Sequence, residues 1–388
     1  MKSNLPDFEA MLAPLVACAS VSSQDPLLDQ SNRAVVELLA QWCADLGARV
    51  EVVPIPGHAG KVNLIATLGE GAGGLVLAGH TDTVPWDADR WQSDPFVLQE
   101  RGGRLYGLGA TDMKGFFPIA LAAMAQADAG RLRAPIVLLA TADEESSMSG
   151  ARALAAAGRR LGRHAVIGEP TAMRPVRAHK GIVMARILVR GRAGHASNPA
   201  LGNSALEGMH AVMAALLAWR AALQARWQDP VFEVPGPTLN LGCIHGGDNP
   251  NRICADCELQ IDLRLLPSMP PEEILHGLRD RVADALAGTG LGFSVEPMID
   301  PVPPFATAAG APIVAAAERL TGSPAGTVGF ASEAPMLAAA GMDVLLFGPG
   351  DIECAHQPDE SIDRARVAPA VDILRGLIRR FCVERSDD

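Results

Sequence analysis

The sequence has few aromatic residues, no basic excess and no long apolar run. Aromatic residues make up 4% of the 388 residues, and the formal net charge at pH 7 is −11. Nucleic-acid surfaces normally need a basic excess, often with aromatic stacking platforms, and anionic membranes also attract basic surfaces, so neither partner is expected. No apolar stretch approaches the roughly 18 residues of a membrane-spanning helix. The first residues, interrupted by Pro6, Asp7 and Glu9, do not resemble a signal peptide.

The seven cysteines are odd in number and scattered, unlike the framework of a disulfide-stabilised secreted protein. Cys254 and Cys257 form a C-x-x-C pair, but no second pair accompanies it to complete a structural zinc site. Residues three apart on a strand point to opposite faces, so we expect two structural thiols. These features predict a cytoplasmic protein.

Three common catalytic signatures are missing as well. The sequence has no G-x-S-x-G elbow, no H-E-x-x-H helix and no G-x-x-x-x-G-K-[ST] phosphate loop. What it does have is ordinary globular material, with 48% hydrophobic residues. A chain of this length exceeds what a single core usually supports, so we expect two domains.

Apolar runs in the sequence are typical of strands buried on both faces of a sheet. They are LVLAG at 75–79, IVLLATA at 136–142, AVIG at 165–168 and VLLF at 344–347. Segments with helical periodicity occur at about 7–19, 31–47 and 115–127. In the second, Ser31 is a candidate N-cap. The pattern predicts an α/β domain whose mixed sheet is flanked by helices.

Near residue 181 the strands begin to alternate apolar and polar residues. The order becomes strand, helix, strand, strand, helix, strand, at 181–190, 204–226, 239–245, 257–265, 271–287 and 292–299. This is the order of the ferredoxin-like split unit, and the prolines at 301, 303 and 304 mark a linker behind it. We therefore predict a discontinuous domain, 1–180 and 300–388, with an α+β domain inserted at 181–299.

Potential metal ligands follow each of the buried runs. His80 follows the first run, Glu145 the second and Glu169 the third, and a short loop leads from the fourth to His356. Ligands of α/β sheets gather at the carboxyl ends of the strands, so we expect these side chains to converge. Asp112 precedes the helix at 115–127, where a loop can bring it to the same edge.

Two imidazoles with several carboxylates suit zinc or a similar divalent ion. One carboxylate shared by two ions leaves positions open for water and substrate, which is typical of a catalytic site. Asp82 is placed to orient the imidazole of His80, and Glu144 to accept a proton from the attacking water. Taken singly, a histidine at a strand end is commonly a satisfied polar residue, and an Asp-Glu-Glu run a solvated loop. Their coincidence favours a two-metal hydrolytic site.

In these residues the chain resembles the acetylornithine deacetylase / succinyl-diaminopimelate desuccinylase family of two-zinc amidohydrolases. The matching segments, in family order over nearly the whole chain, are GHTDTVP at 79–85, GATDMKG at 109–115, ATADEE at 140–145, GEPT at 168–171, RAGHAS at 192–197 and AHQPDE at 355–360. Further segments resemble the acetylornithine deacetylase branch: VRAHKG at 176–181, TLNLGCIHGGDNPNRIC at 238–254 and GFASEAP at 329–335.

The resemblance implies a zinc-peptidase-like catalytic domain with two divalent metal ions per subunit. Zinc is the expected metal, with cobalt or manganese as alternatives. Asp112 would bridge the ions, with Glu145 and His356 on one and His80 and Glu169 on the other. The peptide bond after Asp112 would be cis.

The same resemblance assigns roles beyond the metal ligands. Glu144 would be the general base. The inserted domain would form a homodimer, and His195 on it would reach the partner subunit's site to stabilise the oxyanion. The inserted domain could also close over the substrate as a lid.

Substrate contacts are predicted at two places. Asn251 and Arg252 follow a Gly-Gly-Asp-Asn-Pro turn, and an arginine fork suits the α-carboxylate of a substrate, although a surface arginine is the ordinary alternative. Ser332 and Glu333 are further candidates, because a carboxylate there would suit a cationic side chain.

The implied reaction is metal-dependent hydrolysis of a small-molecule N-acyl amino acid. In the branch named above the reaction converts N2-acetyl-L-ornithine to L-ornithine and acetate, a step of arginine biosynthesis. One alternative is a related deacylase acting on succinyl-diaminopimelate, acetylcitrulline or a dipeptide. Another is a non-catalytic binding protein on the same fold.

Overall fold

The computed structural model describes residues 5–384, and the chain divides into two compact units. Unit 1 comprises Met1–Arg177, Thr307–Gly326 and Ser332–Asp388, and unit 2 comprises Ala178–Ala306 and Thr327–Ala331. The boundaries predicted from the sequence fall near these limits, while the roles given to the two domains stay predictions. Within the described part of the chain, no helix is long and apolar enough to cross a membrane.

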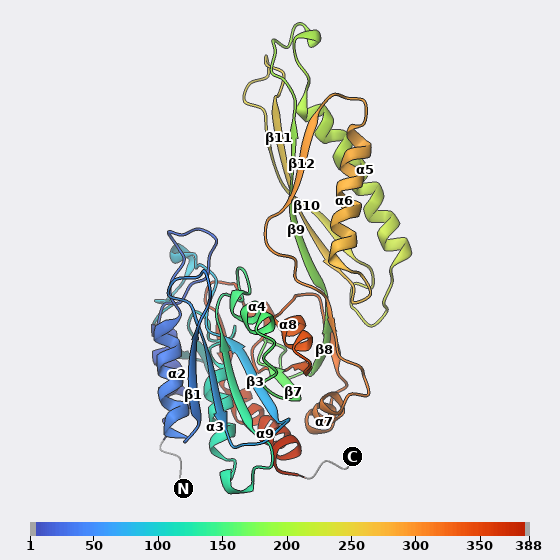
Figure 1. Ribbon diagram of the computed structural model, residues 1–388. Helices are drawn as coiled ribbons and strands as arrows, with labels where there is room; N and C mark the ends of the chain where they lie inside the picture. The colour runs from blue at the N-terminus through green and yellow to red at the C-terminus, as the bar shows by residue number, and fades with distance from the viewer. Residues whose placement is uncertain (1–4, 385–388) are drawn as a thin grey trace. The chain divides into compact units, whose positions relative to one another are not determined.

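Parallel strands form the centre of unit 1 (Figure 1). They are β3 (Leu75–His80), β6 (Ile136–Thr141), β7 (His164–Ile167) and β15 (Asp343–Leu346). β3 lies between β6 and β7, and β15 pairs with the other side of β7. All residues of the first three are buried, which explains their continuous apolar sequence. Because parallel neighbours end at the same edge, the residues that follow them gather there, as predicted.

Other strands extend this sheet or lie where the chain passes between the units. β1 (Arg49–Pro54) and β2 (Val62–Leu68) are antiparallel, and β2 pairs with β6. The boundary strands are β8 (Val176–His179), β13 (Phe305–Ala306) and β14 (Gly326–Val328). The α/β class with a mixed sheet, expected from the sequence, is thereby confirmed.

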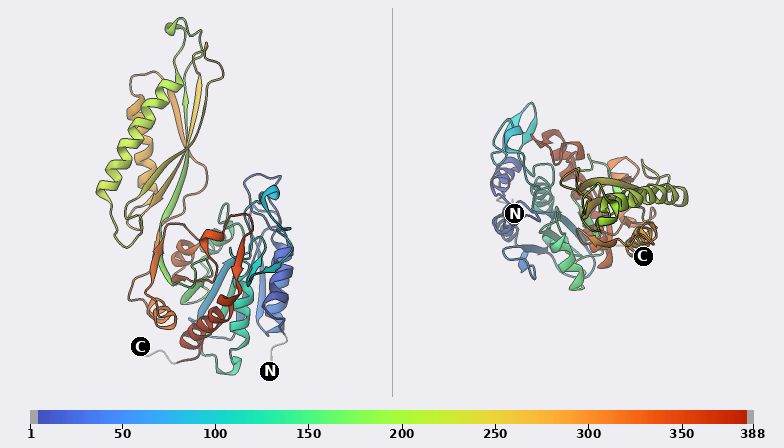
Figure 2. Two further views of the ribbon diagram at one scale, coloured as in Figure 1. Left: turned by 180° about the vertical axis from the view of Figure 1, so that it is seen from behind. Right: turned by 90° about the horizontal axis from the view of Figure 1, so that it is seen from above.

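Helices cover both faces of the unit 1 sheet (Figures 1 and 2). One group comprises α1 (Phe8–Ala17), α2 (Arg33–Asp45), α3 (Phe116–Ala125), α7 (Pro312–Thr321) and α9 (Val367–Ile378). The other comprises α4 (Ser149–Ala156) and α8 (Ala334–Ala339). Pro118 lies in the first turn of α3, where its missing N–H removes no helical hydrogen bond.

The second predicted helix begins later than expected, at Arg33. The N-cap residue is Asn32 and not Ser31, whose hydroxyl accepts the N–H of Arg33 at 3.2 Å and donates to the carbonyl of Gly60. The next residue, Asn32, uses its side chain to bind both the N–H and the carbonyl of Val62 on the neighbouring strand. Tertiary hydrogen bonds thus replace the local cap.

Unit 2 is a four-stranded antiparallel sheet with two helices packed on one face (Figure 1). Along the chain the elements are β9 (Gly181–Arg190), α5 (Ala205–Arg226), β10 (Thr238–Gly246), β11 (Asp256–Leu265), α6 (Pro271–Leu286) and β12 (Gly292–Pro297). The strand order is β10-β11-β9-β12. This confirms the ferredoxin-like prediction, and Ser204 caps α5 by accepting the N–H of Glu207.

A small antiparallel sheet was not predicted. It joins β4 (Gln99–Arg101), β5 (Arg104–Tyr106) and β16 (Ser361–Asp363). Short helical turns complete the described chain: the 3-10 turns Ala88–Arg90, Ala129–Arg131, Pro199–Leu201, Ile352–Cys354 and Arg364–Arg366, and a π turn at Arg379–Val383. The small sheet brings the segment after His356 next to the segment before Asp112.

Candidate metal centre

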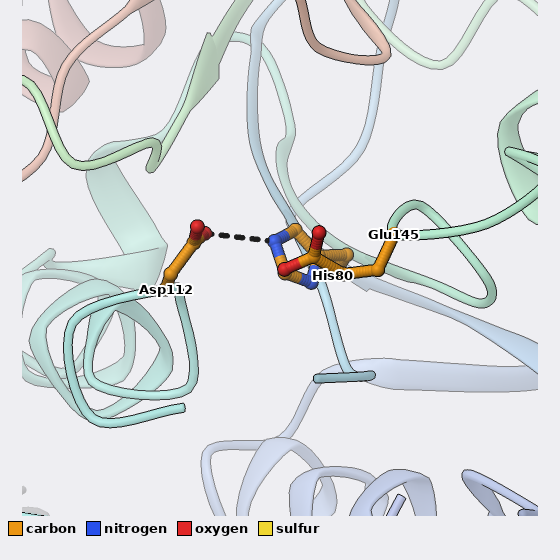
Figure 3. A group of neighbouring side chains, drawn as sticks. All are labelled: His80, Asp112 and Glu145. Carbon is orange, nitrogen blue, oxygen red and sulfur yellow. Dashed lines mark hydrogen bonds and ion pairs between the residues drawn. The ribbon is translucent and has the colours of Figure 1, made fainter. Parts of the chain in front are cut away.

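Three ligand-type side chains from separate segments meet at the carboxyl edge of the parallel strands (Figure 3). His80 ends β3, Glu145 follows β6, and Asp112 precedes α3. One ligand atom from each lies within 4.8 Å of the others. The Nε2 atom of His80 is 3.1 Å from Oδ1 of Asp112. The peptide bond between Asp112 and Met113 is cis, as the resemblance implies.

His356 approaches the second carboxylate oxygen of Asp112. Its Nε2 atom is 2.9 Å from Oε1 of Glu145 and 3.5 Å from Oδ2 of Asp112. The two oxygens of Asp112 therefore face two different imidazoles. This is the placement that a carboxylate shared by two ions needs.

Glu169 contributes a buried carboxylate to the same region. It follows β7 and is 4% exposed, and its Oε1 atom has no hydrogen-bond partner among residues 5–384. Burial raises its pKa well above the usual range, and the nearby charge of Asp112 adds to this effect. Gly168 before it has no side chain, so the ring of Phe116 packs directly against the backbone there.

Burial disfavours the charged form of several acidic groups here. Burial raises the pKa of Glu144 well above its usual range, with a further contribution from Glu169. Burial also raises the pKa of Asp82 to about 6. Two imidazoles, a carboxylate between them and an unpartnered buried oxygen on Glu169 form a donor set that fits divalent cations.

The two imidazoles of the site have raised pKa values. Burial opposes a proton on His80, but the hydrogen bond to Asp112 outweighs it and raises the pKa of His80 well above normal. Hydrogen bonds to Asp112 and Glu145 raise the pKa of His356 to about 11. Without a cation, protons on the imidazoles supply the positive charge, so metal binding must release them.

Asp82 contacts His80 most closely through its backbone, and the orienting role of its carboxylate stays a prediction. Its backbone carbonyl lies 3.0 Å from Nδ1 of His80, whereas its carboxylate is 3.7 Å from that atom. When Nδ1 carries the proton and donates it in a hydrogen bond to this carbonyl, the lone pair of Nε2 points toward Asp112 and can bind a cation. The carboxylate of Asp82 instead accepts the backbone N–H groups of Glu144 and Glu145, at 3.2 and 3.0 Å.

Sequence reasoning missed Glu360, which holds the segment carrying Asp112. Its buried carboxylate accepts backbone N–H groups from Gly109, Thr111 and Asp112, at 2.8, 2.8 and 3.0 Å. Burial raises the pKa of Glu360 to about 8 despite these hydrogen bonds. Its place at the end of the AHQPDE segment was the available signal.

A second missed group lies behind the segment that carries Glu144 and Glu145. The carboxylate of Asp143 accepts hydrogen bonds from the ammonium of Lys61 and the hydroxyls of Ser22 and Ser149. Lys61 is 3% exposed and also contacts Asp29 at 2.8 Å. No motif pointed to Lys61.

Unit 2 brings together His195, predicted to stabilise the oxyanion, and Asn251 and Arg252, predicted to bind the substrate α-carboxylate. His195 and Arg252 form an antiparallel bridge, and the N–H of Ala196 donates to the carbonyl of Asn251 at 3.0 Å. The Nδ1 atom of His195 accepts the N–H of Ser197 at 3.2 Å. In the neutral ring the proton is then on Nε2, which can donate a hydrogen bond.

Ser332 and Glu333 are placed in unit 1, and both are buried. The Oε2 atom of Glu333 accepts the hydroxyl of Thr141 at 2.6 Å, and Ser332 accepts the N–H of Ala334. Burial raises the pKa of Glu333 to about 7. Their assignment to substrate binding stays a prediction.

Comparisons with known proteins cover nearly all of the chain. The profile of peptidase family M20/M25/M40 matches residues 76–380. Acetylornithine deacetylase of Edwardsiella ictaluri is 45% identical over 382 residues, covering 98% of this chain and 100% of that protein. The same enzyme of Proteus mirabilis is 45% identical over 383 residues, with 99% of each chain covered.

Solved structures share the fold at low sequence identity. A tripeptidase from Staphylococcus aureus superposes with a TM-score of 0.76 at 20% identity, covering 98% of this chain and 99% of that one. A dinuclear metal-binding peptidase of the M20 family from Bacillus subtilis gives a TM-score of 0.66 at 13% identity, covering 96% of each chain.

Proposed function

The chain belongs to peptidase family M20/M25/M40 and is a metal-dependent hydrolase, and we propose that it removes the acetyl group from N2-acetyl-L-ornithine. The products are L-ornithine and acetate, which places the reaction in arginine biosynthesis. The observation that carries the proposal is the identity of about 45% to acetylornithine deacetylases over nearly the full chain. All seven cysteines are free thiols, which is typical of a reducing compartment and supports a cytoplasmic location.

We propose that two divalent cations bind at the candidate metal centre. Asp112 would be shared between them, Glu145 and His356 would hold one ion, and His80 and Glu169 would hold the other. Imidazole and carboxylate donors suit zinc, with cobalt and manganese as alternatives. Bound there, the cations would supply a Lewis acid for the scissile carbonyl and would lower the pKa of water toward neutrality.

Glu144 is the general base in this mechanism. It takes a proton from the attacking water and returns it to the amine of the leaving amino acid. The raised pKa that burial gives Glu144 suits a group that must both accept and donate a proton near neutral pH. The carboxylate of Asp82 accepts the backbone N–H of Glu144 and so helps to fix the position of this residue.

Unit 2 supplies the second half of the mechanism in a homodimer. His195 donates from Nε2 to the oxyanion in the partner subunit's site, and the tautomer set by Ser197 supports this role. Arg252, with Asn251 beside it, binds the substrate α-carboxylate. Closure of unit 2 over the substrate would exclude water during the reaction.

Comparison of substrates tests the proposal most directly. The metal-loaded enzyme is assayed on N2-acetylornithine, N-succinyl-diaminopimelate and N-acetylcitrulline, with kcat/KM as the readout. We expect the highest value for acetylornithine. A higher value for another substrate would identify a related deacylase, and absence of hydrolysis on all of them would favour a binding protein.

A further inference from the structure

A pocket in unit 2 carries an arginine and an aspartate that are paired with each other. It has a volume of about 670 Å³ and is formed by the start of α5, the loop 246–254 and the segment 196–203. Arg252 and Asp248 both line it. The Nη1 atom of Arg252 is 2.7 Å from Oδ2 of Asp248.

This ion pair is open to ligands. The Arg252 and Asp248 side chains are 55% and 62% exposed, so water competes for both charges and the pair contributes little to stability. The hydrogen bond uses one guanidinium nitrogen and one carboxylate oxygen. A guanidinium fork can bind a carboxylate through two nitrogens, so a ligand carboxylate can form a better pair with Arg252.

The backbone ties the pair to His195. Arg252 and His195 form an antiparallel bridge, and the N–H of Ile253 donates to the carbonyl of Gly194 at 2.9 Å. The turn before Arg252 is closed by its own N–H, which donates to the carbonyl of Asn249 at 3.1 Å. Because the proposed function brings His195 to the reacting carbonyl, Arg252 and Asp248 are carried to the same substrate.

We propose that Asp248 is the residue that selects substrates with a cationic side chain. The α-carboxylate of the substrate displaces Asp248 from Arg252, and the side-chain ammonium then takes the place of Arg252 at Asp248. Both protein charges keep a partner in this exchange. A substrate with a neutral side chain would still bind Arg252 through its α-carboxylate, but it would leave Asp248 unpaired. The exchange therefore favours an N-acyl amino acid that carries both an α-carboxylate and a side-chain ammonium.

Glu333 is the competing carboxylate for such an ammonium. Its Oε2 atom accepts the hydroxyl of Thr141 and its Oε1 atom has no hydrogen-bond partner among residues 5–384, but Glu333 is only 1% exposed, so an ammonium would have to give up its hydration to reach it. Asp248 needs only to exchange one solvent-exposed partner for another. The inference rests on the proposed function, because it assumes hydrolysis of an N-acyl amino acid near His195.

The test compares two substrates that differ in the ammonium. The homodimer loaded with metal is assayed on N-acetylornithine and on N-acetylnorvaline, whose side chain lacks the charge. We expect Asp248→Asn to lower kcat/KM for acetylornithine roughly 10- to 100-fold, the usual weight of a charged hydrogen bond, with little change for acetylnorvaline. Asp280→Asn removes the same charge from an exposed position on α6, and should leave both values unchanged.

Several outcomes would overturn the inference. An equal loss on both substrates in a folded Asp248→Asn protein would mean that Asp248 only supports the turn. A change of preference in Glu333→Gln but not in Asp248→Asn would assign the ammonium to Glu333. Wild-type enzyme that hydrolyses both substrates equally well also contradicts it, whereas no hydrolysis of any N-acetyl amino acid means that the proposed function fails.

A charge reversal provides a second, independent variant. Asp248→Lys is expected to shift the preference from acetylornithine toward N-acetylglutamate, because the pocket then presents two cations. Unchanged preference in this variant would contradict the assignment even if Asp248→Asn were poorly folded.

Discussion

Hydrogen bonds fix the backbone of the segment that carries Glu144. Asp82 accepts the N–H groups of Glu144 and Glu145. Asp143 accepts the N–H of Met148 through its carbonyl and so closes the turn. The position of Glu144 therefore depends little on its own side chain.

Removing the base should affect the chemical step and not the metal. Glu144→Gln keeps the size of the side chain and loses the proton acceptor, so we expect kcat to fall about 10²- to 10⁴-fold. Metal content, measured by elemental analysis after gel filtration, should be unchanged. Retention of wild-type kcat would remove Glu144 from the mechanism.

The sequence does not reveal which groups the Glu360 carboxylate contacts. Its partners are backbone N–H groups of a segment some 250 positions earlier, and backbone groups leave no signature in a sequence. Asp112, His80 and Glu169 were predictable for the opposite reason, because each adjoins a recognisable strand or helix. The parallel ends of those strands account for the convergence of the predicted ligands.

The Glu360→Gln variant tests whether that contact holds Asp112 in place. A glutamine amide would direct N–H groups at backbone N–H donors, so at least one donor would lose its acceptor. We expect metal affinity to weaken about 10- to 100-fold, the usual effect of a residue that supports a ligand. Competition with a chelator measures it. Glu353→Gln, exposed in the same loop, is the control and should bind metal normally.

At the scale of elements, strong periodicity made unit 2 predictable. The burial of β11 alternates along its length, so its sequence pattern was unambiguous. The strands β4, β5 and β16 have three residues each, too few to show any period. The late start of α2 was also not predictable, because the side chains of Ser31 and Asn32 form hydrogen bonds with backbone groups of Gly60 and Val62.

The stability of the segment 143–148 should depend on the ion pair between Lys61 and Asp143. Lys61→Met leaves the buried carboxylate of Asp143 without its cation, and we expect a loss of stability of about 3–5 kcal/mol in urea unfolding. Combining it with Asp143→Asn should recover much of this loss, because no buried charge remains unpaired.

The control for the Lys61 variant is an exposed pair in the same unit. Arg159 binds Glu51 at 2.6 Å with 36% and 47% exposure, so Arg159→Met should cost only about 0–1 kcal/mol. If Lys61→Met proved equally mild, the buried network would have no special role in holding the segment.

At the scale of the whole molecule, a buried histidine makes folding sensitive to acid. Burial lowers the pKa of His179 from 6.5 to about 4. Between these values the unfolded chain binds the proton and the folded chain does not, so stability is retained above pH 6.5 and lost as the pH falls toward 4. For His179 the loss from pH 7 to pH 5 is about 2 kcal/mol. His179→Gln should flatten the pH dependence of unfolding by that amount, and identical slopes would contradict this.

The proposed homodimer can be tested together with the role of His195. Two inactive variants, Glu144→Gln and His195→Ala, each lack one half of the machinery. In a mixed dimer the site that retains Glu144 receives an intact His195 from the other subunit. Random pairing makes half of the dimers mixed, each with one complete site, so activity should return to about a quarter of the wild-type value.

This recovery would not occur if His195 served its own subunit. Each subunit of the mixed dimer would then lack either its base or its oxyanion donor, and differently tagged, co-purified mixed dimers would stay as inactive as the parents. If His195 has no catalytic role at all, the mixed dimers would be active, but His195→Ala alone would then be active as well. The two measurements together therefore decide whether unit 2 completes the active site across a subunit interface.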